Sequence, residues 1–420
     1  MQRYDTYKDS GVKWLGEIPG HWETMKSKYL WKESFSVSEN GNEDLLSVSQ
    51  YDGVTPAKGD SRSESLKGYK IVSKNDLVIN IMLAWLGGLG VSEYDGLVSP
   101  AYCIYKICND SNPKYLHYLY KTPLYLAEFA RHSSGVVPSR WRMYTDDFGQ
   151  VISLLPPKKE QDAIVDYLDE KMAKIDAAIA QQQKMIELLN ERKQIIINRT
   201  VTRGLNPDAK MKDSGVEWIG EIPVGWKMMA LRFLGFVEKK IINPQNHKSA
   251  LFIEYSMPAY DNGRTPNVVS GENLESSKII LNGSTLLINK LNVHKKRIWF
   301  VQDPVVNSVA STEFVPLNIL TANPLFIEYA LQNQKVVDYL VNNSYGATNS
   351  QRRVSPETIL RIKLPIPSDY EQIEIIQYLN KRIVEIDLAI DTLRNKISLL
   401  QERKQIIINE VVTGKVKVTD

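Results

Sequence analysis

The feature that most constrains this chain is an internal repeat. The twelve residues 8–19 return with two substitutions as residues 212–223, which is 204 positions later. The eight residues Glu191–Asn198 return unchanged as Glu402–Asn409, which is 211 positions later. Two such matches do not arise by chance, so the 420 residues are a tandem duplication of a unit of roughly 200 residues.

Both copies follow the same order of segments. A short segment rich in Trp, Gly and Pro opens each copy, and a variable region follows. The variable region has short β-branched and aromatic runs, such as Leu77–Asn80, cut by Gly, Asn, Asp and Pro. This pattern is typical of strands and turns. A border marked by proline closes each region, at Leu155–Pro157 and Leu364–Pro367. The pattern predicts two mixed domains and an α+β chain.

A long segment without Gly or Pro follows each border. Apolar residues recur there at alternating spacings of three and four, from Ile164 to Ile196 and from Ile375 to Ile407. Gln182 and Lys193 interrupt the first series. This is the pattern of a coiled-coil seam on a helix of about 60 Å. An exposed seam is unfavourable, so we expect the two helices to pack against each other, antiparallel. The alternative is one helix of a larger bundle, but no third helix of that length is predicted.

Composition and motifs exclude several classes of protein. Apolar residues make up 43% and charged residues 24%, as in globular proteins. No apolar run is long enough for a membrane helix, and no signal peptide opens the chain, so a cytoplasmic protein with no membrane partner is expected. Cys103 and Cys108 are expected to be small core residues. No P-loop occurs, and the five histidines show no metal-ligand spacing. Gly87–Gly90 is expected to form a flexible loop rather than a nucleotide cradle.

One faint motif needs an interpretation. Asn112-Pro113 and Asn323-Pro324 resemble part of the Asn-Pro-Pro-Tyr/Phe motif of adenine methyltransferases, but the second proline is absent in both copies. No glycine-rich S-adenosylmethionine loop is visible either. Both dipeptides are better explained as a cap and a first-turn proline of a helix.

Basic residues gather in the second variable region, where residues 227–363 carry a net charge of +6 against −1 for residues 23–154. At the offset of 211, the loop 135–142 aligns with 346–353. Such loops can place guanidinium groups on guanine edges or phosphates. The alternative is a solvated loop whose arginine caps a helix or pairs with Asp146 or Asp147. The candidate DNA-binding residues are Ser139, Arg140, Arg142, Ser350, Arg352, Arg353, Lys295, Lys296 and Arg297.

These features together resemble the specificity subunit of type I restriction–modification systems. The resemblance rests on Asp-Ser-Gly-Val-x-Trp-x-Gly-x-Ile-Pro opening each half, on the Leu-Pro…Glu-Gln borders, and on the repeated helices that end in Glu-Arg-Lys-Gln-Ile-Ile. It covers nearly the whole chain. One departure lies at the second border, where Ile366 stands in place of Pro157.

The resemblance implies a pseudo-two-fold architecture in which two target recognition domains are joined by two long antiparallel coiled-coil helices. It divides the chain into an N-terminal repeat segment (1–22), domain 1 (23–157), a central helix (158–203), a linker with the second repeat segment (204–226), domain 2 (227–367) and a C-terminal helix (368–413). Each domain reads one half of a bipartite site in double-stranded DNA.

The resemblance also implies partners and the absence of catalysis. The helices space the domains and dock two modification subunits, which bind S-adenosylmethionine and methylate adenine. A separate restriction subunit cleaves where the system has one. The chain itself is then no enzyme and holds no cofactor. Two alternatives are a coiled-coil structural adaptor without sequence-specific DNA binding and a stand-alone adenine methyltransferase with a degenerate motif.

Overall fold

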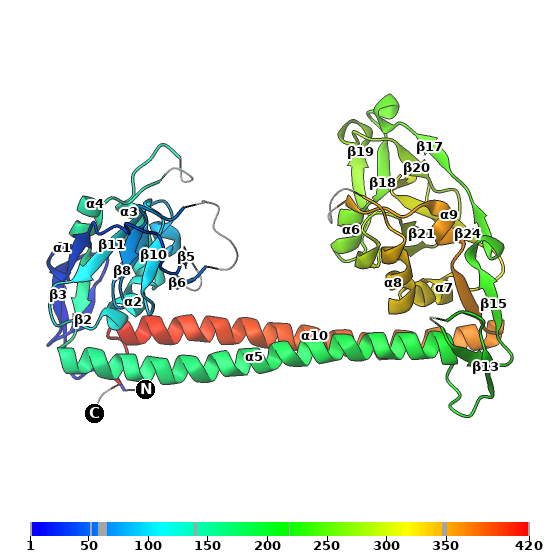
Figure 1. Cartoon of the computed structure of the whole chain (residues 1–420). Helices are drawn as coiled ribbons and strands as arrows, with labels where there is room; N and C mark the ends of the chain where they lie inside the picture. The colour runs from blue at the N-terminus through cyan, green and yellow to red at the C-terminus, as the bar shows by residue number, and fades with distance from the viewer. Residues whose placement is uncertain are drawn as a thin grey trace. The chain divides into compact units, whose positions relative to one another are not determined.

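The computed structural model describes residues 2–50, 53–57, 65–137, 141–217, 219–346 and 351–418. The chain forms two compact units, one of residues 1–183 with 394–420 and the other of residues 184–393. Each unit contains one strand-rich domain and the adjoining parts of two long helices, α5 (Lys158–Arg203) and α10 (Asp369–Val412). Figure 1 shows α5 mainly in green and α10 in orange to red. No helix among the described residues is long and apolar enough to cross a bilayer.

The first unit is built around a four-stranded antiparallel sheet in the order β4-β11-β8-β9. These strands are β4 (Trp31–Ser34), β11 (Tyr102–Ile107), β8 (Leu77–Asn80) and β9 (Leu89–Val91). Four strand pairs surround it: β1 (Tyr7–Asp9) with β2 (Glu17–Pro19), β3 (Glu23–Lys26) with β12 (Ile152–Leu155), β5 (Leu46–Ser49) with β6 (Gly53–Pro56), and β7 (Lys70–Val72) with β10 (Gly96–Val98). The short helices are α1 (Ser27–Leu30), η1 (Ala84–Leu86), α2 (Pro113–Tyr120), α3 (Pro123–Arg131) and α4 (Thr145–Gln150).

The second unit repeats this plan with different residues. Its four-stranded sheet has the order β16-β24-β21-β22, with strands β16 (Gly235–Val237), β24 (Phe314–Ile319), β21 (Thr285–Asn289) and β22 (Ile298–Val301). Two strand pairs match those of the first unit: β13 (Met211–Asp213) with β14 (Glu221–Pro223), and β15 (Lys227–Ala230) with β25 (Lys363–Ile366). A five-stranded sheet, β17-β20-β23-β18-β19, distinguishes this unit.

The strands of that additional sheet are β17 (Lys240–Ile242), β20 (Lys278–Ile280), β23 (Ser308–Ser311), β18 (Leu251–Tyr255) and β19 (Asn267–Ser270). The short helices of the second unit are η3 (Leu231–Phe233), η4 (Pro244–His247), α6 (Met257–Asp261), η5 (Gly271–Asn273), η6 (Val293–Lys295), α7 (Pro324–Leu331), α8 (Gln334–Asn342) and α9 (Pro356–Leu360). The expected α+β duplication is therefore confirmed.

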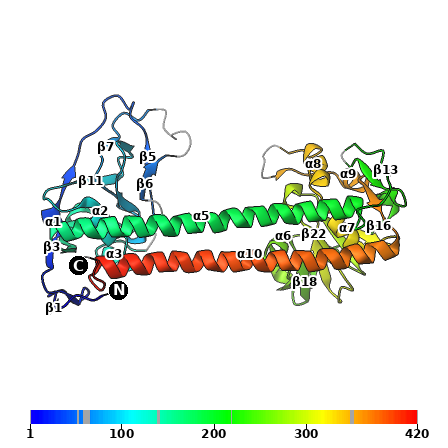
Figure 2. The same cartoon turned by 90° about the horizontal axis from the view of Figure 1, so that it is seen from below.

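Within each unit α5 and α10 lie side by side and antiparallel (Figures 1 and 2). In the second unit Lys193 Nζ lies 2.7 Å from both carboxylate oxygens of Asp387. In the first unit Lys404 Nζ lies 2.7 and 2.8 Å from those of Asp176. Lys404 and Asp387 are the repeat copies of Lys193 and Asp176, each 211 positions later. The polar interruption of the seam at Lys193 therefore forms an ion pair between the helices, and the duplication makes the same contact twice.

The Asn-Pro dipeptides begin helices, as expected. The Asn112 side chain caps α2 and the Asn323 side chain caps α7, each with proline in the first turn. The backbone N–H of Asn112 donates to Gln161 Oε1 on α5 at 2.7 Å, and that of Asn323 donates to Gln372 Oε1 on α10, also at 2.7 Å. The repeated Glu-Gln border thus attaches each domain to the start of its long helix.

Two expectations from the sequence are wrong. Cys108 is exposed just beyond β11, and only Cys103 is partly buried. Gly87–Gly90 is no flexible loop: Gly87 ends η1 in the left-handed conformation with φ 85°, and the residues after Gly88 begin the buried strand β9. A side chain at Gly90 would meet the Cα of Gly53 at 3.1 Å, so the close packing of β6 and β9 favours glycine there.

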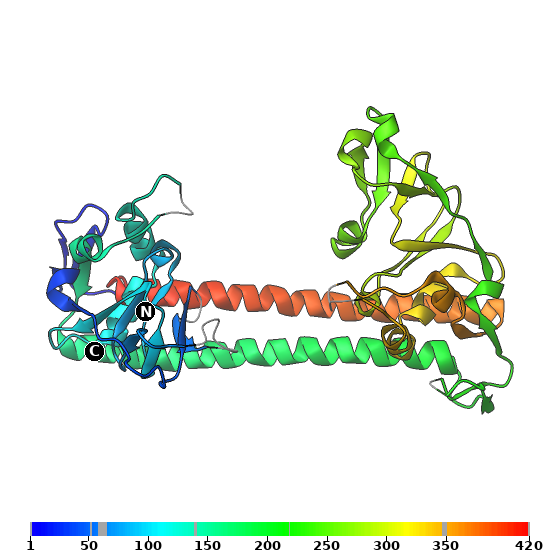
Figure 3. The same ribbon diagram turned by 45° about the horizontal axis from the view of Figure 1, so that its top comes forward.

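The first and last described segments lie together in the first unit (Figure 3). The backbone N–H of Lys417 donates to the carbonyl oxygen of Gln2 at 3.0 Å. The hydroxyl of Tyr7 donates to the carbonyl oxygen of Gly414 at 3.1 Å. The residues after α10 therefore contact the N-terminal segment within the first unit.

Candidate nucleic-acid interface

Two of the predicted segments in the second unit come together at one end of the central sheet. The connection from β21 to β22 (residues 290–297) pairs with the described part of the loop 345–354, and we call these two segments the paired loops of unit 2. The N–H of Asn292 donates to the carbonyl of Arg352 at 2.8 Å, and that of Val354 donates to Lys290 at 2.9 Å. The segment that carries the lysine cluster and the arginine loop thus lie side by side, although their first residues are 55 positions apart in sequence.

Exposed basic groups extend from the paired loops of unit 2. Lys295 is exposed. Arg353 is 44% exposed at its side chain and forms two hydrogen bonds with Glu313, at 3.1 and 3.2 Å. Arg352 donates to the carbonyl oxygen of Ser344 at 3.3 Å. Ser350 lies outside the described residues. Both guanidinium groups are thus held by acceptors of the protein itself, Glu313 for Arg353 and the Ser344 carbonyl for Arg352.

The other two basic residues of the run 295–297 point inward. Lys296 Nζ donates to Gln194 Oε1 of α5 at 2.6 Å, and burial lowers the pKa of its ammonium group. Arg297 is buried and donates to Asp261 Oδ1 of α6 at 2.8 Å. The predicted basic run is therefore divided, because the η6 turn exposes Lys295 and directs its two neighbours into the unit.

The first unit has the same pairing at the same place. The connection from β8 to β9 (residues 81–88) meets the described part of the loop 134–143, and these are the paired loops of unit 1. The N–H of Met143 donates to the carbonyl of Ile81 at 3.0 Å. Ser134 and Arg142 exchange two backbone hydrogen bonds, and Arg142 is exposed. Ser139 and Arg140 lie outside the described residues.

An equivalent asparagine starts both connections. Asn80 is the last residue of β8, and its Oδ1 accepts from the N–H of Met82 at 3.1 Å. Asn289 is the last residue of β21, and its Oδ1 accepts from the N–H of Leu291 at 2.8 Å. Both asparagines are buried. Each fixes the first turn of its connection, so the paired loops are held by the sheet.

Sequence reasoning missed the aromatic component of unit 1. The rings of Trp85 and Trp141 meet edge to face with centroids 5.3 Å apart. Both tryptophans lie in segments rich in turn residues, where a large aromatic side chain has no expected core position. The signal in the sequence is the position of two tryptophans in turn-rich segments, which the distribution of charge does not reveal.

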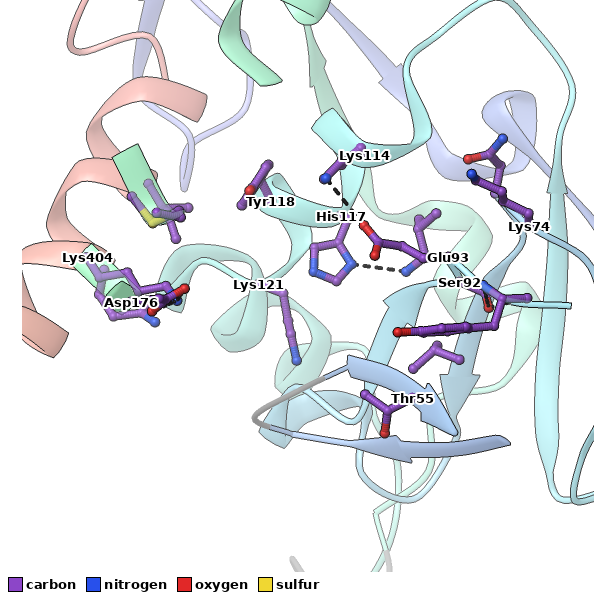
Figure 4. A pocket seen from close by; sticks show the side chains of 17 residues that line it. Thr55, Lys74, Ser92, Glu93, Lys114, His117, Tyr118, Lys121, Asp176 and Lys404 are labelled. Carbon is purple, nitrogen blue, oxygen red and sulfur yellow. Dashed lines mark hydrogen bonds and ion pairs between the residues drawn. The ribbon is translucent and has the colours of Figure 1, made fainter. Parts of the chain in front are cut away.

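A cavity of about 790 Å³ lies in the first unit between β6, β9, α2 and the two long helices (Figure 4). Three of the lysines that line it have partners in the protein. Lys114 Nζ lies 2.8 Å from Asp169 and 3.3 Å from Glu93. Lys121 donates to two backbone carbonyls at 2.7 and 2.8 Å, and Lys404 pairs with Asp176. Two of these charges, those of Lys114 and Lys404, are thus paired with carboxylates of the protein.

The His117 imidazole on this cavity is held in its neutral form. Its Nδ1 accepts from the N–H of Val91 at 3.0 Å (Figure 4), an acceptor role that protonation would abolish. Burial, followed by the charges of Lys121 and Lys114, lowers the pKa of His117 to about 4. The pKa in the unfolded chain is higher, so the unfolded state binds the proton first as the pH falls.

The first unit should therefore lose stability between pH 6.5 and pH 4 through this one group. We expect a loss of about 1–3 kcal/mol in the free energy of unfolding, reduced from the full linkage value because the ring is only partly buried. Urea unfolding of wild type and His117→Asn at pH 7 and pH 5 tests this, because the Asn Oδ1 can take over the Nδ1 acceptor role without titrating. An equal pH dependence in both proteins would contradict it.

Among the described residues no three His, Cys, Asp or Glu side chains gather as a metal site. The chain belongs by its fold to a class of duplicated chains. In this class two sheet domains are attached to a pair of long antiparallel helices. A chain from a solved structure of a type I R-M system has this fold, with a TM-score of 0.66 and 13% identity over 95% of this chain and 99% of that one.

Curated relatives are specificity subunits. The specificity subunit of the type I restriction enzyme MjaVIII from Methanocaldococcus jannaschii is 24% identical over 63% of this chain, and the match spans 62% of that relative's length. A protein named as the specificity subunit of the type I restriction enzyme MjaX, from the same organism, is 23% identical over 98% of both chains. No family model matches the sequence. The resemblance to type I specificity subunits is thus confirmed.

Proposed function

We propose that this chain is the DNA sequence-specificity subunit of a type I restriction–modification complex, in which each domain reads one half of a bipartite site in double-stranded DNA. One observation carries the proposal. The same pair of loops recurs at the same end of the same four-stranded sheet in both units, while the side chains on those loops differ. A duplicated scaffold with different side chains on equivalent loops suits the reading of two unlike half-sites.

The two long helices are proposed to dock two modification subunits. Support comes from apolar side chains outside the seam between the helices. Leu188 and Ile195 in the second unit are 47% and 56% exposed, and their repeat copies Leu399 and Ile406 in the first unit are 65% and 48% exposed. Each pair is spaced by seven residues, which places both members on one side of a helix. Exposed apolar stripes of this kind suit partner helices.

In this proposal the chain itself performs no chemistry. The modification subunits would bind S-adenosylmethionine and transfer its methyl group to adenine, and restriction subunits would join where the system has them. The second candidate, a structural adaptor, rests on the same helices. Methylation sequencing of DNA from cells carrying the chain and its modification subunit distinguishes the two. A bipartite methylated motif that depends on the chain supports the proposal, and unchanged methylation without the chain favours the adaptor.

Replacing Arg353 by Ala should weaken DNA binding by about 1–3 kcal/mol if its guanidinium contacts a base edge, and should relax one position of one half-site. A phosphate contact would instead weaken binding to all sequences and reduce the salt dependence. Binding of the assembled complex to cognate duplexes at several salt concentrations separates these results. Arg232→Ala removes an exposed arginine of the same unit outside the paired loops and is the matched control. If Arg353→Ala keeps the wild-type affinity and motif, the arginine has no role in DNA binding and only forms its ion pair with Glu313.

A further inference from the structure

The connections within the paired loops of the two units differ in surface chemistry. In unit 1 the connection after β8 presents Met82, Leu83 and Leu86, which are 41%, 39% and 40% exposed. With Trp85 and Trp141 they form what we call the apolar surface. In unit 2 the corresponding connection and loop instead expose His294, Lys295 and Arg353, among other residues. The connection at this position in the fold is therefore mainly apolar in unit 1 and mainly basic in unit 2.

The apolar surface is held in place before any partner binds. The indole N–H of Trp85 donates to the carbonyl of Met82 at 3.2 Å, and the ring of Trp85 rests against that of Trp141. Ala84 beneath them is fully buried. Gly87 closes the turn of η1 with its N–H donating to Ala84 at 2.9 Å. Several large apolar side chains exposed on one connection between strands indicate a contact surface.

The position of this surface indicates the partner. It adjoins Arg142, whose backbone pairs with Ser134 and whose side chain is exposed. In unit 2 the same place exposes Lys295 and Arg353, residue types that suit contact with phosphates. Among the base edges of the major groove, the C5-methyl of thymine is the characteristic apolar group, and apolar side chains recognise it. We infer that unit 1 reads its half-site partly by apolar contact of Met82, Leu83 and Leu86 with thymine methyl groups.

This inference rests on the proposed function, but its test can fail while the proposed function still holds. After methylation sequencing has given the motif, duplexes are prepared in which deoxyuridine replaces thymine in one half-site or the other. This change removes only the C5-methyl. The complex of the full chain with its modification subunits should bind one of the two substituted duplexes about fourfold more weakly for each contacted methyl, since burial of one such carbon contributes about 0.8 kcal/mol. The other substituted duplex should bind nearly as well as the unmodified one.

A double variant links the effect to the apolar surface. Leu83→Ser/Leu86→Ser should bind the thymine duplex more weakly and should no longer distinguish thymine from deoxyuridine in that half-site. The matched control is Leu320→Ser, which changes a leucine that is 71% exposed in the other unit; it should keep the full difference.

Three results would overturn the inference while leaving DNA recognition intact. One is sequence-specific binding that is indifferent to deoxyuridine in both half-sites. Another is an unchanged thymine preference in the double variant. The third is a double variant that fails to assemble with the modification subunits although it is folded, which would assign the apolar surface to a protein partner. Loss of all sequence-specific binding by the wild-type complex would instead count against the proposed function itself.

Discussion

Replacing residues 23–154 with the same region of a related specificity subunit is expected to change one half of the methylated motif and leave the other half unaltered. The structure explains why this exchange is feasible. The region begins in β3 and ends in β12, which pair with each other: Thr24 lies opposite Leu154 in the register, and Glu23 lies opposite Leu155. Both junctions therefore lie on one two-stranded ladder. The first and last residues of the exchanged region are thus close together in the structure.

The scaffold side of these junctions must be kept for the exchanged domain to dock. The N–H of Trp22 donates to the carbonyl of Pro19 at 2.9 Å, and its indole donates to Glu160 at 3.2 Å. Within the exchanged region, the cap at Asn112 must meet Gln161. A donor region should therefore contain an Asn-Pro helix start at the position of α2. With that contact retained, we expect a complex that is assembled and active, because the long helices are untouched.

Methylation sequencing of the chimaera measures the result. The reciprocal exchange, residues 227–363 between β15 and β25, is the control and should change the opposite half of the motif, because Lys363 and Ala230 form the equivalent ladder. A chimaera that alters both halves would show that the domains do not read independently. A chimaera that retains both original halves would show that sequence is read outside the exchanged region.

The sequence predicted the elements that depend on periodicity and repetition. The 3/4 spacing of apolar residues predicted helices where α5 and α10 lie, and the ion pair of Lys193 with Asp387 shows why a polar residue is tolerated there. The caps at Asn112 and Asn323 were predicted because proline in the first turn is a local signal. Such features need only neighbouring residues, so they are visible in the sequence without the fold.

The candidate interface was predicted less completely because it depends on tertiary pairing. Nothing in the sequence shows that residues 290–297 meet residues 345–354, or that the η6 turn directs Arg297 toward Asp261. The prediction of DNA-binding residues from charge also did not include the aromatic pair of Trp85 and Trp141. Backbone turns such as the one at Gly87 decide which side chains of a loop face outward. A sequence pattern does not predict the φ value of a single residue in such a turn.

Replacing Glu160 by Leu is expected to cause a large loss of stability in the first unit. The Glu160 carboxylate accepts from the hydroxyl of Tyr4 at 2.6 Å and the indole of Trp22 at 3.2 Å, and its other oxygen lies 2.7 Å from His21 Nε2. Glu160 and Tyr4 are buried, and burial followed by the bond to Glu160 raises the pKa of the Tyr4 hydroxyl, which keeps it a donor. Leucine would leave these buried donors without an acceptor, at a cost of about 2–4 kcal/mol.

The duplication supplies the matched control for this substitution. Glu371 is the copy of Glu160 and accepts from the indole of Trp226 at 3.3 Å, but the positions of Tyr4 and His21 are taken by Asp208 and Gly225. Its remaining partner, Ser368, is exposed to water. Glu371→Leu should therefore cost only about 1 kcal/mol. Urea unfolding of the two variants measures both losses. Equal losses would show that the conserved tryptophan contact alone stabilises the start of each long helix, since that contact is what the two copies share.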